Sequence, residues 1–144
     1  MAIKNKVVII TGASSGIGKA TALLLAESGA KVVLAARNQE KLEKAVNEIK
    51  ERNGEAIYKV TDVSKREEVK SLIDFTISKY GKIDVIFNNA GLMPNSPLSE
   101  FRTDEWDEMI DVNLKGVVNG IEAVLPHFIE QKSGHVISTS SVAG

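Results

Sequence analysis

The stretch that decides the fold is VVIITGASSGIG, residues 7–18 of the 144-residue chain. Four consecutive β-branched residues, Val7–Ile10, form an apolar run typical of a strand that is buried on both faces. Three glycines follow within seven positions, at Gly12, Gly16 and Gly18, and a helical pattern begins among them. Glycine at such a turn permits a tight bend and lets the backbone approach a bound group. The stretch therefore predicts a strand, a tight turn and a helix whose N-terminus faces an anion.

The rest of the chain repeats this alternation of apolar runs and amphipathic stretches. Alternation at this spacing predicts an α/β fold with a parallel sheet. Right-handed crossovers then favour a Rossmann-type, doubly wound sheet with strand order 3-2-1-4-5, in which the last strands of such a sheet are absent. The ligand crevice is expected between the first and fourth strands. The four further predicted strands are Val32–Ala36, Ala56–Val60, Ile83–Phe87 and Val136–Thr139.

Local signals predict where two of the helices begin and end. Ser64 and Glu67 have the spacing of a capping box, which predicts a helix that starts beside Ser64. A longer helical pattern runs from about Trp106 to Ile129, and Pro126 is expected to end or bend it.

Composition limits the classes of protein that fit. With 43% hydrophobic and 26% charged residues, the chain is expected to form a single domain over residues 1–144. A net charge of −1 excludes a general basic surface for nucleic acid. The absence of cysteine excludes a thiolate zinc site and a cysteine nucleophile, and no other residues have metal-ligand spacing. The apolar run before Gly12 is too short for a membrane span, so a cytoplasmic protein is expected.

Five segments, in order along the chain, resemble motifs of the short-chain dehydrogenase/reductase family. Thr11–Gly18 resembles its Thr-Gly-x-x-x-Gly-x-Gly turn, and Asn88–Gly91 resembles its Asn-Asn-Ala-Gly motif. Asp62-Val63 matches the segment that faces the adenine. Asn113 and Ser141 stand where the family has two of its catalytic residues. The resemblance implies a nicotinamide cofactor bound by Gly12, Ser14, Ser15, Gly16, Ile17, Gly18, Arg37, Asp62, Val63, Asn89, Ala90 and Gly91.

The end of the second predicted strand bears on which cofactor binds. Ala36 stands where NAD-preferring family members carry aspartate, and Arg37 follows it. A guanidinium without a carboxylate beside it favours NADP, with NAD as the second possibility. Ser15 stands where many NADP-preferring relatives have a basic residue, which makes the expected preference moderate. The alternative for Arg37 is a solvated surface residue at the start of the next helix.

The resemblance also implies a catalytic tyrosine and a catalytic lysine, which the 144 residues do not contain in the required pattern. Family members carry a Tyr-x-x-x-Lys motif about a dozen residues beyond the serine. Tyr58 and Tyr80, the two tyrosines of this chain, are each followed four residues later by aspartate. We therefore expect the 144 residues alone to be inactive. Asn113 also has a structural alternative, as a hydrogen-bonding residue inside a helix, and Ser141 has one as plain polarity at a strand end.

Three hypotheses about function follow. The first is an NADP(H)-dependent reductase acting on a carbonyl or secondary alcohol. The second is a non-catalytic half-domain that binds a nucleotide, and the third is a fragment that binds none. The helix around Thr103–Glu130 resembles the one through which family members dimerise, so a homo-oligomer is expected.

Overall fold

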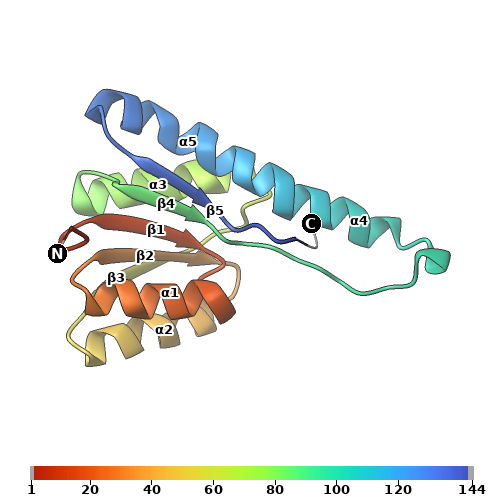
Figure 1. Ribbon diagram of the computed structural model, residues 1–144, viewed down its shortest axis with the longest axis horizontal. Coiled ribbons are helices and arrows are strands. Elements are labelled where there is room, and N and C mark those ends of the chain that lie inside the picture. The colour runs from red at the N-terminus through yellow and green to blue at the C-terminus, as the bar shows by residue number, and fades with distance from the viewer. Residues whose placement is uncertain (1, 143–144) are drawn as a thin grey trace.

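The computed structural model describes residues 2–142 and shows one parallel sheet between two layers of helices (Figure 1). The strand order is β3-β2-β1-β4-β5, as predicted from the sequence. The strands are β1 (Val7–Thr11), β2 (Lys31–Ala36), β3 (Glu55–Val60), β4 (Val85–Asn88) and β5 (His135–Ser138). The helices are α1 (Gly16–Glu27), α2 (Gln39–Glu51), α3 (Arg66–Tyr80), η1 (Leu98–Glu100), α4 (Thr103–Met109), η2 (Ile110–Lys115) and α5 (Gly116–Gln131).

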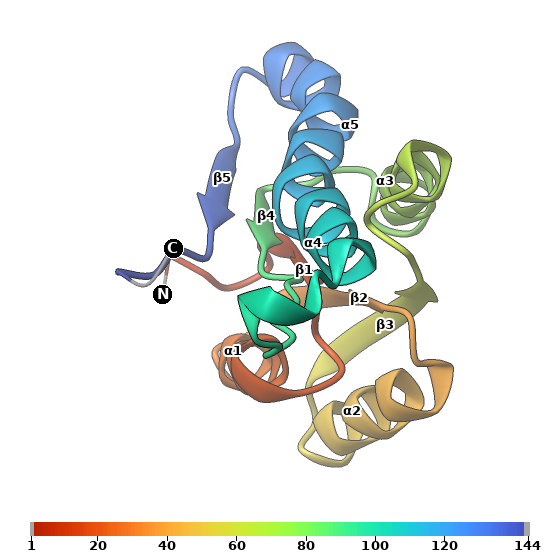
Figure 2. The ribbon, with the colours of Figure 1, turned by 90° about the vertical axis from the view of Figure 1, so that its right-hand side faces the viewer.

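The alternation of side chains along β1 and β2 divides the core into two halves. Val8 and Ile10 of β1 belong to the cluster that packs under α1 and α2. Val7 and Ile9 belong to the opposite cluster, together with residues of α3 and α5. Figure 2 shows α1 and α2 on one side of the sheet and α3 and α5 on the other. Every residue of β1 is buried, which explains why its sequence is continuously apolar instead of alternating.

The parallel register brings the carboxyl ends of the central strands together. Thr11 pairs with Ala35 of β2, and Ile10 pairs with Phe87 of β4. The glycine turn after β1 and the Asn89–Gly91 segment after β4 therefore emerge side by side. This is the point at which the strand order reverses, where ligands bind in doubly wound sheets.

The predicted capping box at the start of α3 is wrong. The helix begins at Arg66, and Lys65 precedes it without a side-chain hydrogen bond to the helix. The Ser64 hydroxyl instead donates to Oδ1 of Asp62 at 2.7 Å, and the Ser64 backbone N–H donates to the same oxygen at 3.0 Å. Ser64 thus belongs to an aspartate-centred turn and lies one residue before the N-cap position, which Lys65 holds.

Pro126 does not end the long helix, which continues to Gln131. Its side chain is on the exposed side of α5, where water can reach the carbonyl left without an N–H partner. The irregular part of the helix lies earlier, in the π-helical segment η2 that joins α4 to α5. None of the helices within residues 2–142 has the length and apolar character needed to cross a bilayer.

Candidate functional site

A cleft of about 470 Å³ opens at the carboxyl ends of the central strands. Ten of the twelve residues expected to bind a cofactor line it: Gly12, Ser14, Ser15, Ile17, Arg37, Asp62, Val63, Asn89, Ala90 and Gly91. The other two, Gly16 and Gly18, are in the turn without lining the cleft. The sequence reasoning did not identify several further lining residues, which are Asn38, Thr61, Leu92, Val112 and Thr139.

The glycine turn has the conformation and crowding that require glycine. Gly12 and Gly16 adopt φ values of +63° and +55°, in the left-handed region. A Cβ on Gly12 would lie 2.8 Å from Cα of Ala90. A Cβ on Gly18 would overlap the Gly12 carbonyl oxygen and lie 2.7 Å from Nδ2 of Asn89. Gly18 therefore lets α1 approach both turns that border the cleft.

The N-terminus of α1 is open toward the cleft. Ser15 precedes the helix with an extended backbone, and its side chain makes no capping hydrogen bond. The first-turn amides of α1 therefore lack the side-chain acceptor that a capped helix has. Because Ser14, Ser15 and Ile17 line the cleft, these amides and the positive end of the helix dipole are available to an anion there.

The buried Thr11 hydroxyl joins the two turns. Its Oγ1 accepts hydrogen bonds from the backbone N–H groups of Asn89 and Ala90, both at 3.0 Å. The hydroxyl lies 3.4 Å from the Phe87 carbonyl oxygen, to which it donates. In the sequence, Thr11 is only the first residue of the Thr11–Gly18 motif. The structure shows that it fixes the position of the segment after β4 against the end of β1.

The Asn89 side chain continues this connection toward β5. Its Oδ1 accepts a hydrogen bond of 2.8 Å from the Thr139 hydroxyl, and its Nδ2 lies 3.5 Å from the Gly12 carbonyl oxygen. Thr139, just past the end of β5, lines the cleft. Ser141 follows it on an exposed segment and is not among the lining residues.

The surroundings of Asp62 favour the ionised form of its carboxyl. Burial raises the pKa of its carboxyl, but the hydrogen bonds from the Ser64 hydroxyl and N–H lower it, as do the charges of Arg37 and Lys65. The net effect holds the pKa of Asp62 below its ordinary value. The side chain is thus a hydrogen-bond acceptor that carries a negative charge at one end of the cleft.

Arg37 has a carboxylate partner that sequence reasoning missed. Its Nη1 lies 3.5 Å from Oε1 of Glu108 in α4, and both side chains are about half exposed, at 56% and 52%. No local pattern relates these two residues, because one follows β2 and the other belongs to a helix near the far end of the chain. Arg37 thus lines the cleft and forms an exposed ion pair with a residue of α4.

Asn113 holds the segment after β4 in place. Its Oδ1 accepts from the Leu92 N–H at 2.8 Å, and its Nδ2 donates to the Leu92 carbonyl at 2.7 Å. The residue lies within η2, and its carboxamide mimics the pairing of a neighbouring strand. The structure thus gives Asn113 a positioning role, with both of its side-chain polar atoms engaged by the backbone of a residue that lines the cleft.

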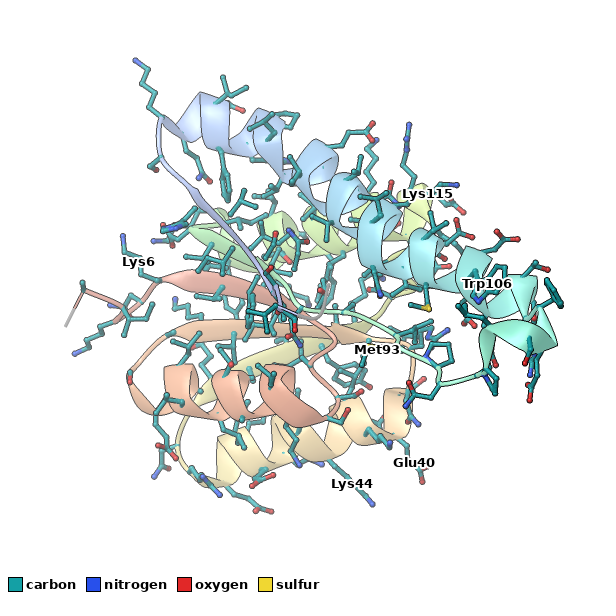
Figure 3. All side chains as sticks on the ribbon, turned by 45° about the vertical axis from the view of Figure 1, so that its right-hand side comes forward. Lys6, Glu40, Lys44, Met93, Trp106 and Lys115 are labelled. Atoms are coloured by element: carbon teal, nitrogen blue, oxygen red, sulfur yellow. The ribbon has the colours of Figure 1, made fainter. Side chains whose placement is uncertain are left out.

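The described part of the chain contains no group of three or more His, Asp or Glu side chains that could hold a metal ion. Figure 3 shows Met93 in the loop after β4 and Trp106 in α4, both on the side of the molecule where the cleft opens. Neither residue lines the cleft itself.

Comparison with known proteins gives consistent matches. The family model for short chain dehydrogenases matches residues 6–144. An uncharacterized oxidoreductase of Listeria monocytogenes is 70% identical over the whole chain, which covers 58% of that relative. The chain therefore spans a little over half the length of the curated relatives it matches.

Two solved structures show the same fold with different nucleotides. A short chain dehydrogenase/reductase from Burkholderia phymatum in complex with NAD matches with a TM-score of 0.94 and 35% identity, over 99% of this chain and 51% of that one. A metagenomic short-chain oxidoreductase in complex with NADP matches with a TM-score of 0.91 and 38% identity, over 99% and 65%. Both nucleotides are thus bound by proteins with this architecture.

Proposed function

The chain belongs to the short chain dehydrogenase family of NAD(P)-binding oxidoreductases, and on that premise we propose that it binds NADP(H) and serves reduction of a carbonyl or oxidation of a secondary alcohol. The observation that carries the proposal is the cleft at the switch point, which combines an uncapped helix N-terminus with Arg37 and with alanine at position 36. We further propose that residues 1–144 form one dinucleotide-binding domain.

The residues around the cleft fit the parts of such a nucleotide. The glycine turn and the first-turn amides of α1 would hold the pyrophosphate, because Gly12 and Gly18 leave a cradle that side chains would fill. Asp62 and Val63 would border the adenine, and Arg37 would pair with a 2′-phosphate. When bound, the nicotinamide supplies or accepts the hydride.

The segments after β4 and β5 border the remaining part of the cleft. Asn89, Ala90 and Gly91 line it. Thr11 binds the backbone N–H groups of Asn89 and Ala90, and Asn113 binds the backbone of Leu92, the residue that follows Gly91. Ser141 would orient the substrate oxygen by a hydrogen bond. Proton transfer would fall to the tyrosine and lysine that the family resemblance places beyond it. The alternative is a non-catalytic unit that binds the nucleotide without turnover.

The proposal is tested by titrating the purified protein with NADPH and by following the absorbance of the reduced nicotinamide in the presence of ketones and aldehydes. Binding together with carbonyl-dependent loss of absorbance supports the oxidoreductase. Binding without turnover supports the nucleotide-binding unit only in a protein that carries the Tyr-x-x-x-Lys motif, because the 144 residues alone are expected to be inactive. A melting temperature that does not respond to saturating nucleotide contradicts both.

Replacing Arg37 with alanine tests the choice of nucleotide. A hydrogen bond to a charged group contributes about 1.5–3 kcal/mol, so the variant is expected to bind NADPH about 10- to 100-fold more weakly. NADH, which lacks the 2′-phosphate, should lose much less affinity. Dissociation constants for both nucleotides provide the measurement, and equal losses would contradict the assignment.

We also propose that a second copy of the chain covers the long helix. Exposed apolar side chains recur along one face of η2 and α5, at Ile110, Leu114, Val118, Leu125 and Ile129. Exposed apolar side chains gathered on one helix face are typical of a protein interface.

The change Leu114→Glu is expected to weaken self-association at least about tenfold, because it places a charge in the proposed apolar contact. Light scattering over a concentration series provides the measurement. Leu24→Glu, on α1, is the control, since the two leucines are 63% and 62% exposed. A concentration-dependent mass unchanged by Leu114→Glu would argue against this interface.

A further inference from the structure

The guanidinium of Arg37, which is proposed to bind the 2′-phosphate, has carboxylates beside it. Among the residues lining the cleft within the described chain, Arg37 is the one with a positive charge. Two carboxylates lie near it. Glu108 forms the ion pair at 3.5 Å, and Asp62 is close enough for Arg37 to influence its ionisation. They come from different elements, α4 and the loop between β3 and α3.

We propose that Glu108 is a specificity-determining residue, which lowers the affinity of the cleft for nucleotides that carry a 2′-phosphate relative to those that do not. The inference rests on the proposed placement of the 2′-phosphate at Arg37. It adds a role for a residue of α4, which lies outside the strand ends and the glycine turn.

The two nucleotides place different demands on the ion pair. A 2′-phosphate that binds Arg37 must displace the Glu108 carboxylate or share the guanidinium with it. Either outcome brings two negative groups together or breaks a favourable contact. A ribose with a free 2′-hydroxyl makes no such demand and leaves the pair intact.

The exposure of the pair limits the size of the effect. An exposed ion pair shifts an equilibrium by no more than about fivefold, and repulsion between the carboxylate and the phosphate adds to this. We therefore expect removal of the Glu108 charge to strengthen NADPH binding by roughly three- to tenfold, and to change NADH binding by less than about twofold. Because salt screens exposed charges, the gain should shrink as the ionic strength rises.

The test uses Glu108→Gln, which removes the charge and keeps the shape of the side chain. Asp107→Asn is the matched control, because this substitution makes the same change in net charge. Asp107 is the exposed neighbour of Glu108 on α4 and has no ion pair within residues 2–142. Dissociation constants for NADPH and NADH are measured by equilibrium titration, so the test does not depend on turnover. The expected result is a selective gain for NADPH in Glu108→Gln and little change in Asp107→Asn.

The double variant Arg37→Ala/Glu108→Gln separates this inference from the proposed function. If Glu108 acts through Arg37, its substitution should no longer favour NADPH once Arg37 is absent. If Arg37→Ala weakens NADPH selectively but Glu108→Gln has no selective effect, this inference fails and the proposed function stands. Equal gains in Glu108→Gln and Asp107→Asn would also overturn it, because they would show a general effect of charge. If Arg37→Ala does not discriminate between the nucleotides, the placement of the 2′-phosphate fails, and the inference fails with it.

Discussion

Replacing Gly18 with alanine is expected to weaken nucleotide binding at least about 100-fold. The same change should lower the free energy of unfolding by about 3 kcal/mol. The added Cβ would overlap the Gly12 carbonyl oxygen and lie 2.7 Å from Nδ2 of Asn89. One of these neighbours is backbone, so it cannot rotate away. The start of α1 would have to move out from the turn, which displaces the amides proposed to hold the pyrophosphate.

Two other glycines provide controls for the Gly18 prediction. Gly16 and Gly81 have φ values of +55° and +77°, and a Cβ on either would meet no atom within 4 Å. Alanine at either position should lower the free energy of unfolding by about 1–2 kcal/mol, through backbone strain alone. Gly81→Ala, at the far end of α3, should leave affinity unchanged. Urea unfolding and nucleotide titration of the three variants provide the measurements, and a Gly18→Ala protein that binds like the Gly81→Ala protein would contradict the close-contact argument.

The strand order and the glycine turn were predictable because their causes are local. Continuous β-branched runs indicate strands buried on both faces, and Val7–Thr11 is such a strand. The alternation of strands and helices then leaves few topologies. Gly12 could be recognised for the same reason, because its positive φ belongs to the local turn and favours glycine, whereas its close approach to Ala90 could not be predicted from the sequence.

The contacts that complete the site were not predictable, because they join residues far apart in the sequence. Nothing around Arg37 indicates Glu108, and nothing around Thr11 indicates that its hydroxyl accepts two hydrogen bonds from the segment after β4. Asn113 is intermediate. The family resemblance drew attention to this residue, and the structure supplies the partner, Leu92, which the sequence could not.

The failure of the capping box has the same origin at short range. Ser64 has the residue type and spacing that the motif requires, but Asp62 stands two residues earlier and accepts its hydroxyl and its N–H. The motif also requires the serine to be the residue directly before the helix, whereas Lys65 holds that place because α3 begins at Arg66. In the turn, both Ser64 groups donate to the Asp62 carboxylate, which is a stronger acceptor than a neutral group.

Replacing Thr11 with valine is expected to lower the free energy of unfolding by about 2–4 kcal/mol, because two backbone N–H groups lose their acceptor. Valine has nearly the same shape as threonine, so the packing of β1 should be retained. The effect should come from the N–H groups of Asn89 and Ala90, which now bond to Thr11 Oγ1 at 3.0 Å. Because both residues line the cleft, nucleotide affinity should fall as well.

Thr11→Ser isolates the contribution of the hydroxyl. Serine keeps the acceptor for both N–H groups and removes one methyl group. The Thr11→Ser protein should therefore lose only about 1 kcal/mol in the free energy of unfolding and bind nucleotide with nearly unchanged affinity. Hydrogen exchange at the amides of Asn89 and Ala90 provides a local readout, with faster exchange expected in Thr11→Val and near-normal protection in Thr11→Ser. If the valine protein is as stable as the serine protein and protects both amides equally well, the hydroxyl does not hold the two turns together. The alignment of the glycine turn with the segment after β4 would then depend on Asn89 and on strand pairing alone.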